Sequence, residues 1–196
     1  MALVACGAIA QPCAELVALN GWPVDVHPLP PLLHNQPHRI ADRVEELGEE
    51  LEGRYPAVAV GYADCGTYGA LDTVCTRRGW HRLEGLHCYD FYAGHGVVER
   101  LFEEEPGTYL LTDFLVRSFD RTVLAELGLD RYPELRDAYF AHYARVVWLR
   151  QDRAGGLEEQ ARAAAEHLGL PLEVVDTGQR GLSVAIERLL VGAGLL

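Results

Sequence analysis

Short apolar runs alternate with amphipathic segments along the chain. The runs that predict strands lie at 2–6, 24–30, 57–63, 81–86, 145–151 and 172–178. The segments that predict helices lie at 8–19, 37–51, 71–78, 91–105, 130–142, 157–168 and 182–190, and the segment 108–116 is strand-like and then helical. Strands separated by helices favour a mainly parallel sheet.

Two segments show how the spacing of hydrophobic residues differs between a predicted helix and a predicted strand. The segment 37–51 carries Ile40, Val44, Leu47 and Leu51 at helical spacing. The run 57–63, by contrast, is apolar on consecutive positions, as expected for a strand that is buried on both faces. We therefore predict one α/β domain over 1–196, with a Rossmann-like, doubly wound sheet and helices on both faces.

Composition and simple motifs exclude several classes of function. The chain has 196 residues and a net charge of −12, which disfavours nucleic acid and anionic membranes as partners. Its 17 basic residues are all arginine, and the absence of lysine excludes Schiff-base chemistry and a Walker lysine. Gly61, Gly66 and Gly69 do not have the spacing of a dinucleotide-binding turn. The N-terminus lacks a charged leader pattern, so we expect a cytoplasmic protein, whose five cysteines are free, metal-bound or catalytic.

Three of the cysteines stand where apolar runs stop. LVACG includes Cys6, VAVGYADCG includes Cys65, and LEGLHCY includes Cys88. The carboxyl ends of parallel strands line a common crevice, so these sulfurs are expected to converge. Cys13 and Cys75 lie inside amphipathic helices and are expected to pack there.

Two histidines could complete a site with these sulfurs. His34 lies in a polar insert before a predicted helix, and His87 precedes Cys88. Three thiolates and one imidazole suit a zinc ion or an iron–sulfur cluster, and the residues do not decide between them. Tyr62 and Gly66 are candidates for lining a cofactor in the same crevice.

A second constellation comprises Asp113, Arg117 and Asp120. If the stretch is helical, the three share one face and form an ion-pair ladder. The alternative is that Arg117 holds the carboxylate or phosphate of a cofactor. The aromatic stripe of Tyr139, Phe140 and Tyr143 either packs internally or covers a homodimer interface.

Six sequence motifs occur along the chain in this order: LVACGAI, LLHNQP, VGYADCGTYG, GLHCYDFYAG, TYLLTDFL and LGLDRYPELRDAYFAHY. Together they resemble an uncharacterised bacterial and archaeal family, domain of unknown function 1638. The resemblance covers essentially the whole chain, and its motifs map onto Cys6, His34, Cys65, His87 and Cys88. It implies no established activity. Some relatives are encoded with corrinoid-dependent methyltransferase systems, which implies corrinoid methyltransferase components as partners and a role in methyl-group metabolism.

Three functions remain open from the sequence. The first is a metal site of Cys6, Cys65 and Cys88, completed by His34 or His87. The second is metal-free catalysis with Cys65 as nucleophile and one of these histidines as base. The third is a non-catalytic partner of a corrinoid protein, in which the cysteines only pack.

Overall fold

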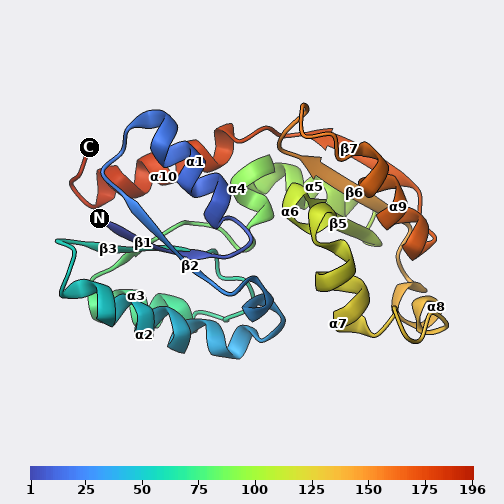
Figure 1. The fold of residues 1–196 in the computed structure, drawn as a ribbon, viewed down its shortest axis with the longest axis horizontal. Coiled ribbons are helices and arrows are strands. Elements are labelled where there is room, and N and C mark those ends of the chain that lie inside the picture. The colour runs from blue at the N-terminus through green and yellow to red at the C-terminus, as the bar shows by residue number, and fades with distance from the viewer. The chain divides into compact units, whose positions relative to one another are not determined.

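The computed structural model describes residues 1–196, apart from the side chain of His95. It contains two all-parallel sheets flanked by helices, which confirms the prediction of a Rossmann-like α/β fold (Figure 1). The strands are β1 Ala2–Cys6, β2 Asp25–Leu29, β3 Val58–Gly61, β4 His81–Arg82, β5 Thr108–Thr112, β6 Arg145–Arg150 and β7 Leu172–Asp176. The α-helices are α1 Ala10–Asn20, α2 Ile40–Glu52, α3 Ala70–Arg78, α4 Tyr89–Ala93, α5 His95–Glu104, α6 Asp113–Arg117, α7 Ala125–Leu127, α8 Leu135–Phe140, α9 Glu158–Leu168 and α10 Arg180–Gly192. Short 3₁₀ segments occupy η1 Pro31–Asn35 and η2 Pro37–Arg39, and a π-helical turn occupies η3 Asp120–Leu124.

The chain divides into two compact units, although the sequence predicted one domain with one sheet. The first unit comprises 1–91 and 180–196, and the second comprises 92–179. The second unit is thus a continuous insertion between the two parts of the first. Hydrophobic periodicity predicts elements but carries no information on which strands pair, so it could not reveal this division.

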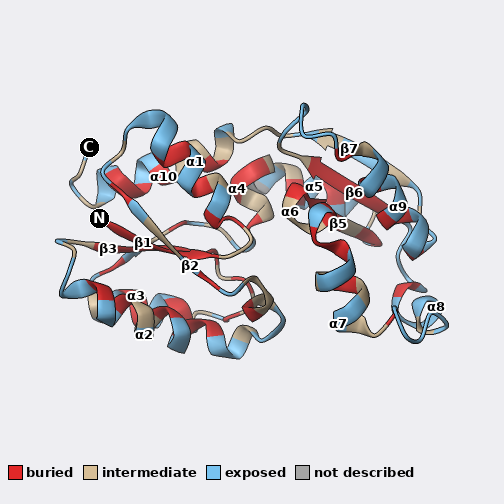
Figure 2. Ribbon diagram, viewed as in Figure 1, coloured by how far each residue is buried: buried red, intermediate tan, exposed pale blue. Residues whose placement is uncertain are grey.

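The first unit has the strand order β2-β1-β3-β4. In it α1 and α10 lie over one face of the sheet, and α2 and α3 lie over the other (Figure 1). Every residue of β1 and β3 is buried, as the apolar runs predicted (Figure 2). The chain leaves β1 toward β2 on one side and continues with β3 on the other, so the order reverses between β1 and β3. Ligands of open α/β sheets bind at the carboxyl ends of strands at such a point.

Some sequence-based boundaries were wrong. The strand expected at 81–86 is only His81–Arg82, and Cys88 lies in a turn before α4 rather than at a strand end. The helix expected at 91–105 is two helices, separated by Gly94 in a left-handed conformation with φ 82°. The helix expected at 130–142 is limited to α8.

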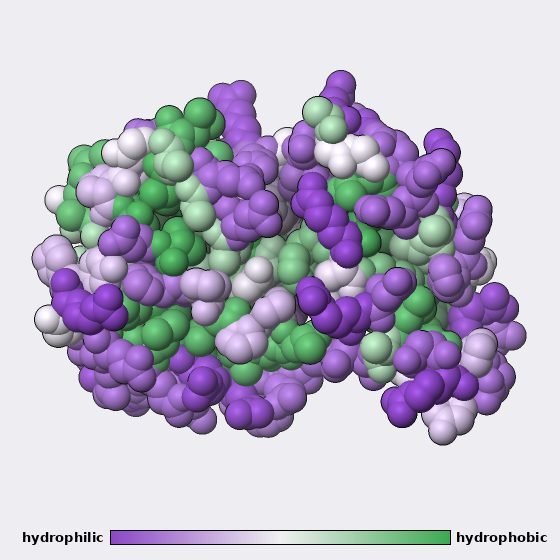
Figure 3. Space-filling model, viewed as in Figure 1, coloured by the Kyte–Doolittle hydropathy of each residue, from purple (hydrophilic) through white to green (hydrophobic). Residues whose placement is uncertain are grey.

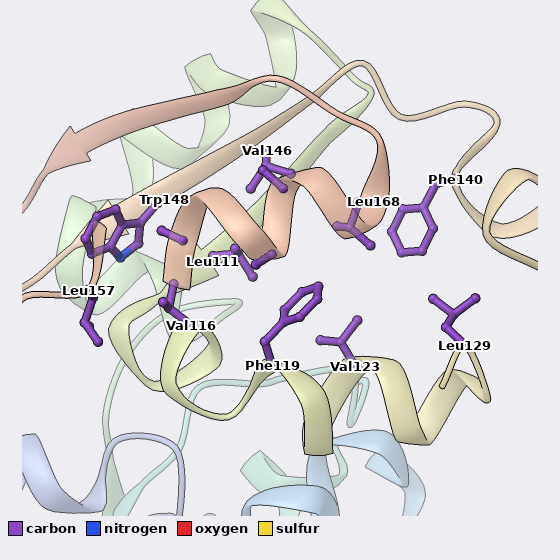
Figure 4. Packing of buried hydrophobic residues seen from close by; sticks show 13 residues of the cluster. Leu111, Val116, Phe119, Val123, Leu129, Phe140, Val146, Trp148, Leu157 and Leu168 are labelled. Atoms are coloured by element: carbon purple, nitrogen blue, oxygen red, sulfur yellow. The ribbon is translucent and has the colours of Figure 1, made fainter. Parts of the chain in front are cut away.

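The second unit has the strand order β5-β6-β7. One face of its sheet packs against α6, η3 and α9, and Trp148 is fully buried in this core, beside Leu157 and Val116 in Figure 4. Phe140 of α8 lies in the same core, where it contacts Tyr109 and Tyr143. The aromatic stripe of 139–143 therefore packs at least partly within the unit, while Tyr139 remains 48% exposed.

Hydrophilic side chains cover much of the face drawn in Figure 3, interrupted by smaller hydrophobic patches. None of the helices in the described part of the chain is both long and apolar enough to cross a membrane.

Gly48 in α2 shows how tightly the first unit packs. A Cβ at this position would overlap the Trp80 ring, with Cζ3 at 2.6 Å and Cζ2 at 2.7 Å. The ring has little room to move, because its Nε1 donates to Glu52 at 2.9 Å and the side chain is buried.

Gly48→Ala is therefore expected to lower the free energy of unfolding by about 1–3 kcal/mol, although alanine favours helices by up to about 1 kcal/mol. Gly53→Ala at the end of the same helix is the control, because no atom lies within 4 Å of its Cβ and its φ is −74°. Urea unfolding should show this control to be neutral or slightly more stable. Equal effects of the two substitutions would contradict the close contact with Trp80.

Candidate functional site

The first unit brings the three predicted cysteines together. Cys6 is the last residue of β1, and Cys65 lies four residues beyond the end of β3. Cys88 and Cys65 are buried, as is Cys6 at 1% exposure. Each thiol lies close enough to the others for their charges to interact. We call Cys6, Cys65 and Cys88 the thiol cluster.

Backbone hydrogen bonds explain why Cys88 joins the cluster. The amide of Asp64 donates to the Gly85 carbonyl at 3.0 Å, and the amide of Cys65 donates to the Leu86 carbonyl at 2.8 Å. These two bonds hold the loop after β4 against the loop after β3. Cys88 therefore reaches Cys65 through a loop contact and not, as predicted, through the end of a strand.

Asp64 organises the loop that carries Cys65. Its carboxylate accepts hydrogen bonds from the amides of Gly66, Tyr68 and Gly69 and from the Thr67 hydroxyl, at 2.9–3.2 Å. Burial raises the pKa of this carboxyl, but the hydrogen bonds lower it by more, so that the pKa lies below its usual range. The carboxylate is thus present at neutral pH to hold the loop.

The same loop holds Cys65 in an uncommon conformation. Cys65 and Gly66 follow one another with φ values of 51° and 82°. A left-handed backbone is unfavourable for a residue with a Cβ, and such conformations persist only where the surroundings enforce them. Gly66, predicted to line a cofactor, faces the ring of Pro37, which lies 3.5 Å from the position of a Cβ.

His34 reaches the cluster from the segment after β2. Cys6 pairs with Leu29 at the end of the β1–β2 ladder, and the chain then turns into η1, which carries His34. The Nδ1 of His34 lies 3.7 Å from the Sγ of Cys6. Gly7 permits this approach, since a Cβ there would overlap the Leu29 carbonyl and lie 2.7 Å from the Pro31 nitrogen. The backbone of 29–31 thus packs closely against Gly7, the residue after Cys6.

His87 is placed differently from His34. It is exposed, and its amide donates to the Asp90 carboxylate at 3.1 Å in the turn before α4. Burial lowers the pKa of His34, and the nearby His87 lowers it further, so His34 is neutral at pH 7. A neutral imidazole is the form that binds metals.

Tyr62 is the residue directly after β3, and its side chain is only 1% exposed. Burial raises the pKa of its hydroxyl, and the three nearby thiols raise it further. The hydroxyl lies beside Cys6, but among the described residues it has no well-aligned hydrogen-bond partner. A buried hydroxyl without a partner is uncommon in folded proteins.

Burial dominates the acidity of the thiols. It raises the pKa of Cys65 to about 12, with a further contribution from Cys6, and it also raises the pKa of Cys6 and Cys88. Cys13 and Cys75 are buried in α1 and α3. Burial raises their pKa values to about 12 and about 11, and Cys6 adds to the shift of Cys13. The cluster is therefore protonated at neutral pH in the metal-free protein.

Within the described part of the chain, no three Cys, His, Asp or Glu side chains are already arranged so that they could hold a metal ion. A cavity of about 320 Å³ lies elsewhere in the unit, lined by Val58 at the start of β3 and by Trp80 and His81. It is thus at the opposite ends of the strands from the thiol cluster.

Arg117, the remaining predicted cofactor residue, belongs to the second unit and is exposed. The predicted ion-pair ladder was wrong, because the Asp113 carboxylate points at β6 and its neighbours. It accepts from Trp148 Nε1 at 2.9 Å and from the amides of Gln151 and Asp152 at 3.2 and 2.9 Å. The i, i+4 spacing could not reveal these partners, which lie 35–39 residues away.

Sequence reasoning gave no particular role to Asp90, and it missed how Asp64 acts. Both use a carboxylate to bind backbone amides in the loops that present Cys65 and Cys88. An Asp next to Gly and Thr residues is a signal for such a turn, and VGYADCGTYG contains it.

The strand order and the thiol cluster define a class: a Rossmann-like α/β protein with buried sulfurs at the switch point of its first sheet. A family model described as "Protein of unknown function (DUF1638)" matches residues 28–185, and the chain belongs to this family. His34, Cys65 and Cys88 lie inside the matched span, and Cys6 precedes it. No curated protein and no solved structure matches the chain.

Proposed function

We propose that the first unit binds a metal, as a zinc ion or an iron–sulfur cluster, through Cys6, Cys65, Cys88 and His34. The convergence of three buried thiols and one imidazole beside the carboxyl ends of β1 and β3 supports this proposal. Three sulfurs and one nitrogen satisfy the tetrahedral preference of zinc, and thiolates also hold iron–sulfur clusters. We assign the fourth position to His34 rather than to His87, because His34 contacts Cys6 whereas His87 is exposed.

On this proposal, metal binding is coupled to the loss of protons. Metals bind thiolates, and burial disfavours the thiolate in the metal-free protein. A bound cation would supply the positive charge that buried thiolates need. Cys6 at the end of β1, His34 in η1, and Cys65 and Cys88 in the loops that Asp64 and Asp90 hold would be its ligands.

We further propose that the metal serves methyl-group metabolism linked to corrinoid proteins, either as a catalyst or in an accessory role. Zinc would act as a Lewis acid or hold a thiol substrate as its thiolate, and a cluster would transfer electrons or hold a substrate at an open iron. The association of relatives with corrinoid-dependent methyltransferase systems supports this role. We place the protein in the cytoplasm, where five free cysteines would stay reduced.

A metal-free cysteine nucleophile is the second candidate function, and the contact between Cys6 and His34 favours it. The contact moves the nucleophile from Cys65, which the sequence suggested, to Cys6. Burial counts against this candidate, because it raises the pKa of the Cys6 thiol. A single thiol that reacts with iodoacetamide near neutral pH in the metal-free protein would support it over the metal site.

Purification without oxygen, followed by metal and sulfide analysis, tests the metal site. We expect about one equivalent of zinc, or iron with matching sulfide. Cys6→Ala and Cys65→Ala should remove most of the metal. Cys75→Ala is the matched control and should retain it, because Cys75 is buried in α3 outside the cluster. Less than about a tenth of an equivalent in the unaltered protein, or equal loss in the control, would overturn the proposal.

A further inference from the structure

The hydroxyl of Tyr62 is not needed for packing at its buried position. The residue follows β3 at the switch point of the first sheet and is almost completely buried. A phenylalanine would fill the same volume and would leave no polar atom without a partner. The hydroxyl instead lies among the three sulfurs, which are the polar groups that act on it.

The neighbouring sulfurs are poor partners in the metal-free protein. A thiol is only a weak hydrogen-bond acceptor. A thiolate, by contrast, is an anionic acceptor and forms much stronger hydrogen bonds. The hydroxyl therefore gains a partner when one of the sulfurs binds a metal as its thiolate.

Cys6 is the sulfur that the hydroxyl can reach. It lies within hydrogen-bonding reach of the Tyr62 hydroxyl, whereas Cys65 and Cys88 are neighbours that make no such contact among the described residues. The Nδ1 of His34 lies 3.7 Å from the same sulfur, so Cys6 has polar neighbours on two separate segments of the first unit.

We propose that the Tyr62 hydroxyl donates a hydrogen bond to the metal-bound sulfur of Cys6, and that Tyr62 is a positioning residue of the metal site. This inference rests on the proposed metal-binding function. Hydrogen bonds to ligating groups orient them and tune the metal, and their loss weakens metal binding by about 10–100-fold. The bond also withdraws electron density from the sulfur, which changes the spectrum of a bound transition metal.

Cobalt(II) titration of the metal-free protein tests the inference. Tyr62→Phe should still bind one cobalt ion, but about tenfold more weakly, and its sulfur-to-cobalt charge-transfer band should move to lower energy. Tyr68→Phe removes the same hydroxyl six residues away, at a side chain that is 95% exposed, and should match the unaltered protein. If the purified protein holds an iron–sulfur cluster, the reduction potential should fall in Tyr62→Phe and not in Tyr68→Phe.

The possible outcomes distinguish the role of Tyr62 from the proposed metal site on which it rests. Failure of the unaltered protein to bind cobalt would refute the metal site itself. Cobalt binding with the same affinity and the same band in Tyr62→Phe would refute the role of Tyr62 and leave the metal site standing. Urea unfolding of the metal-free proteins provides a further check, because removal of an unpartnered hydroxyl should not lower stability. A variant that loses stability and keeps its cobalt band would show that Tyr62 has only a packing role.

Discussion

Asp113→Ala is expected to lower the free energy of unfolding by about 3–4 kcal/mol, the largest stability effect among our predictions. The Asp113 side chain is 4% exposed, and its carboxylate accepts from the Trp148 indole and from the amides of Gln151 and Asp152. Alanine leaves these donors inside the second unit without an acceptor. Each buried group that loses its partner costs about 1–3 kcal/mol, and the loop after β6 can restore hydration only by moving away.

Urea unfolding, followed by the fluorescence of buried Trp148, measures this effect. Asp137→Ala in the same unit is the control, because the Asp137 side chain is largely exposed and forms a surface ion pair with its neighbour Arg136. A surface ion pair of this kind contributes at most about 1 kcal/mol. Asp113→Asn should fall between the two, since its amide retains one acceptor oxygen. If Asp113→Ala costs no more than Asp137→Ala, the carboxylate does not anchor β5 to the loop after β6.

Asp64→Ala is expected to have the largest effect on the candidate site. Without the carboxylate, three amides and the Thr67 hydroxyl lose their acceptor, and the left-handed backbone at Cys65 loses most of the hydrogen bonds that hold its loop. The loop is free to relax, and Cys65 moves away from Cys6 and Cys88. Zinc or cobalt affinity should fall at least about tenfold, and the free energy of unfolding should fall by about 2 kcal/mol.

Isothermal titration of the metal-free protein measures the loss of affinity. Asp72→Ala provides the comparison, because Asp72 lies on the nearby helix α3 and pairs with Arg82 at its surface. This variant should keep its metal. Retention of full metal affinity by Asp64→Ala would show that the loop does not position Cys65 for binding.

The sequence predicted the buried helices and strands well, because the spacing of their hydrophobic residues depends on which side of each element faces the core. β1, β3 and β6 are near-continuous apolar runs, and α2 and α9 show helical spacing. The pairing of the strands depends on contacts between distant segments, so the second sheet was not foreseen. The predicted partner of Asp113 was wrong for the same reason. The local i, i+4 spacing suggested an ion pair with Arg117, but the carboxylate accepts a hydrogen bond from the distant Trp148.

In the candidate site, too, local patterns were predictable and contacts between distant segments were not. The positions of Cys6 and Cys65 followed from parallel strands and their carboxyl ends. His34 was one of two histidines offered for the site, and the strand pattern did not distinguish it from His87. Cys88 reaches the cluster through loop hydrogen bonds that no strand pattern contains. Tyr62 could be chosen as a lining residue, but a hydroxyl without a partner is visible only in three dimensions.

Helix α10 has a consequence for the order in which the protein folds during synthesis. Leu182, Ile186, Leu189 and Leu190 are buried, and α10 contacts α1 and β4 of the first unit. The ribosome delivers these side chains after the whole of the second unit has emerged. The second unit is continuous in sequence and can fold first, while the first unit must wait for its closing helix. The cysteines emerge early but are enclosed late, so during synthesis they are open to metal, oxidant or a chaperone.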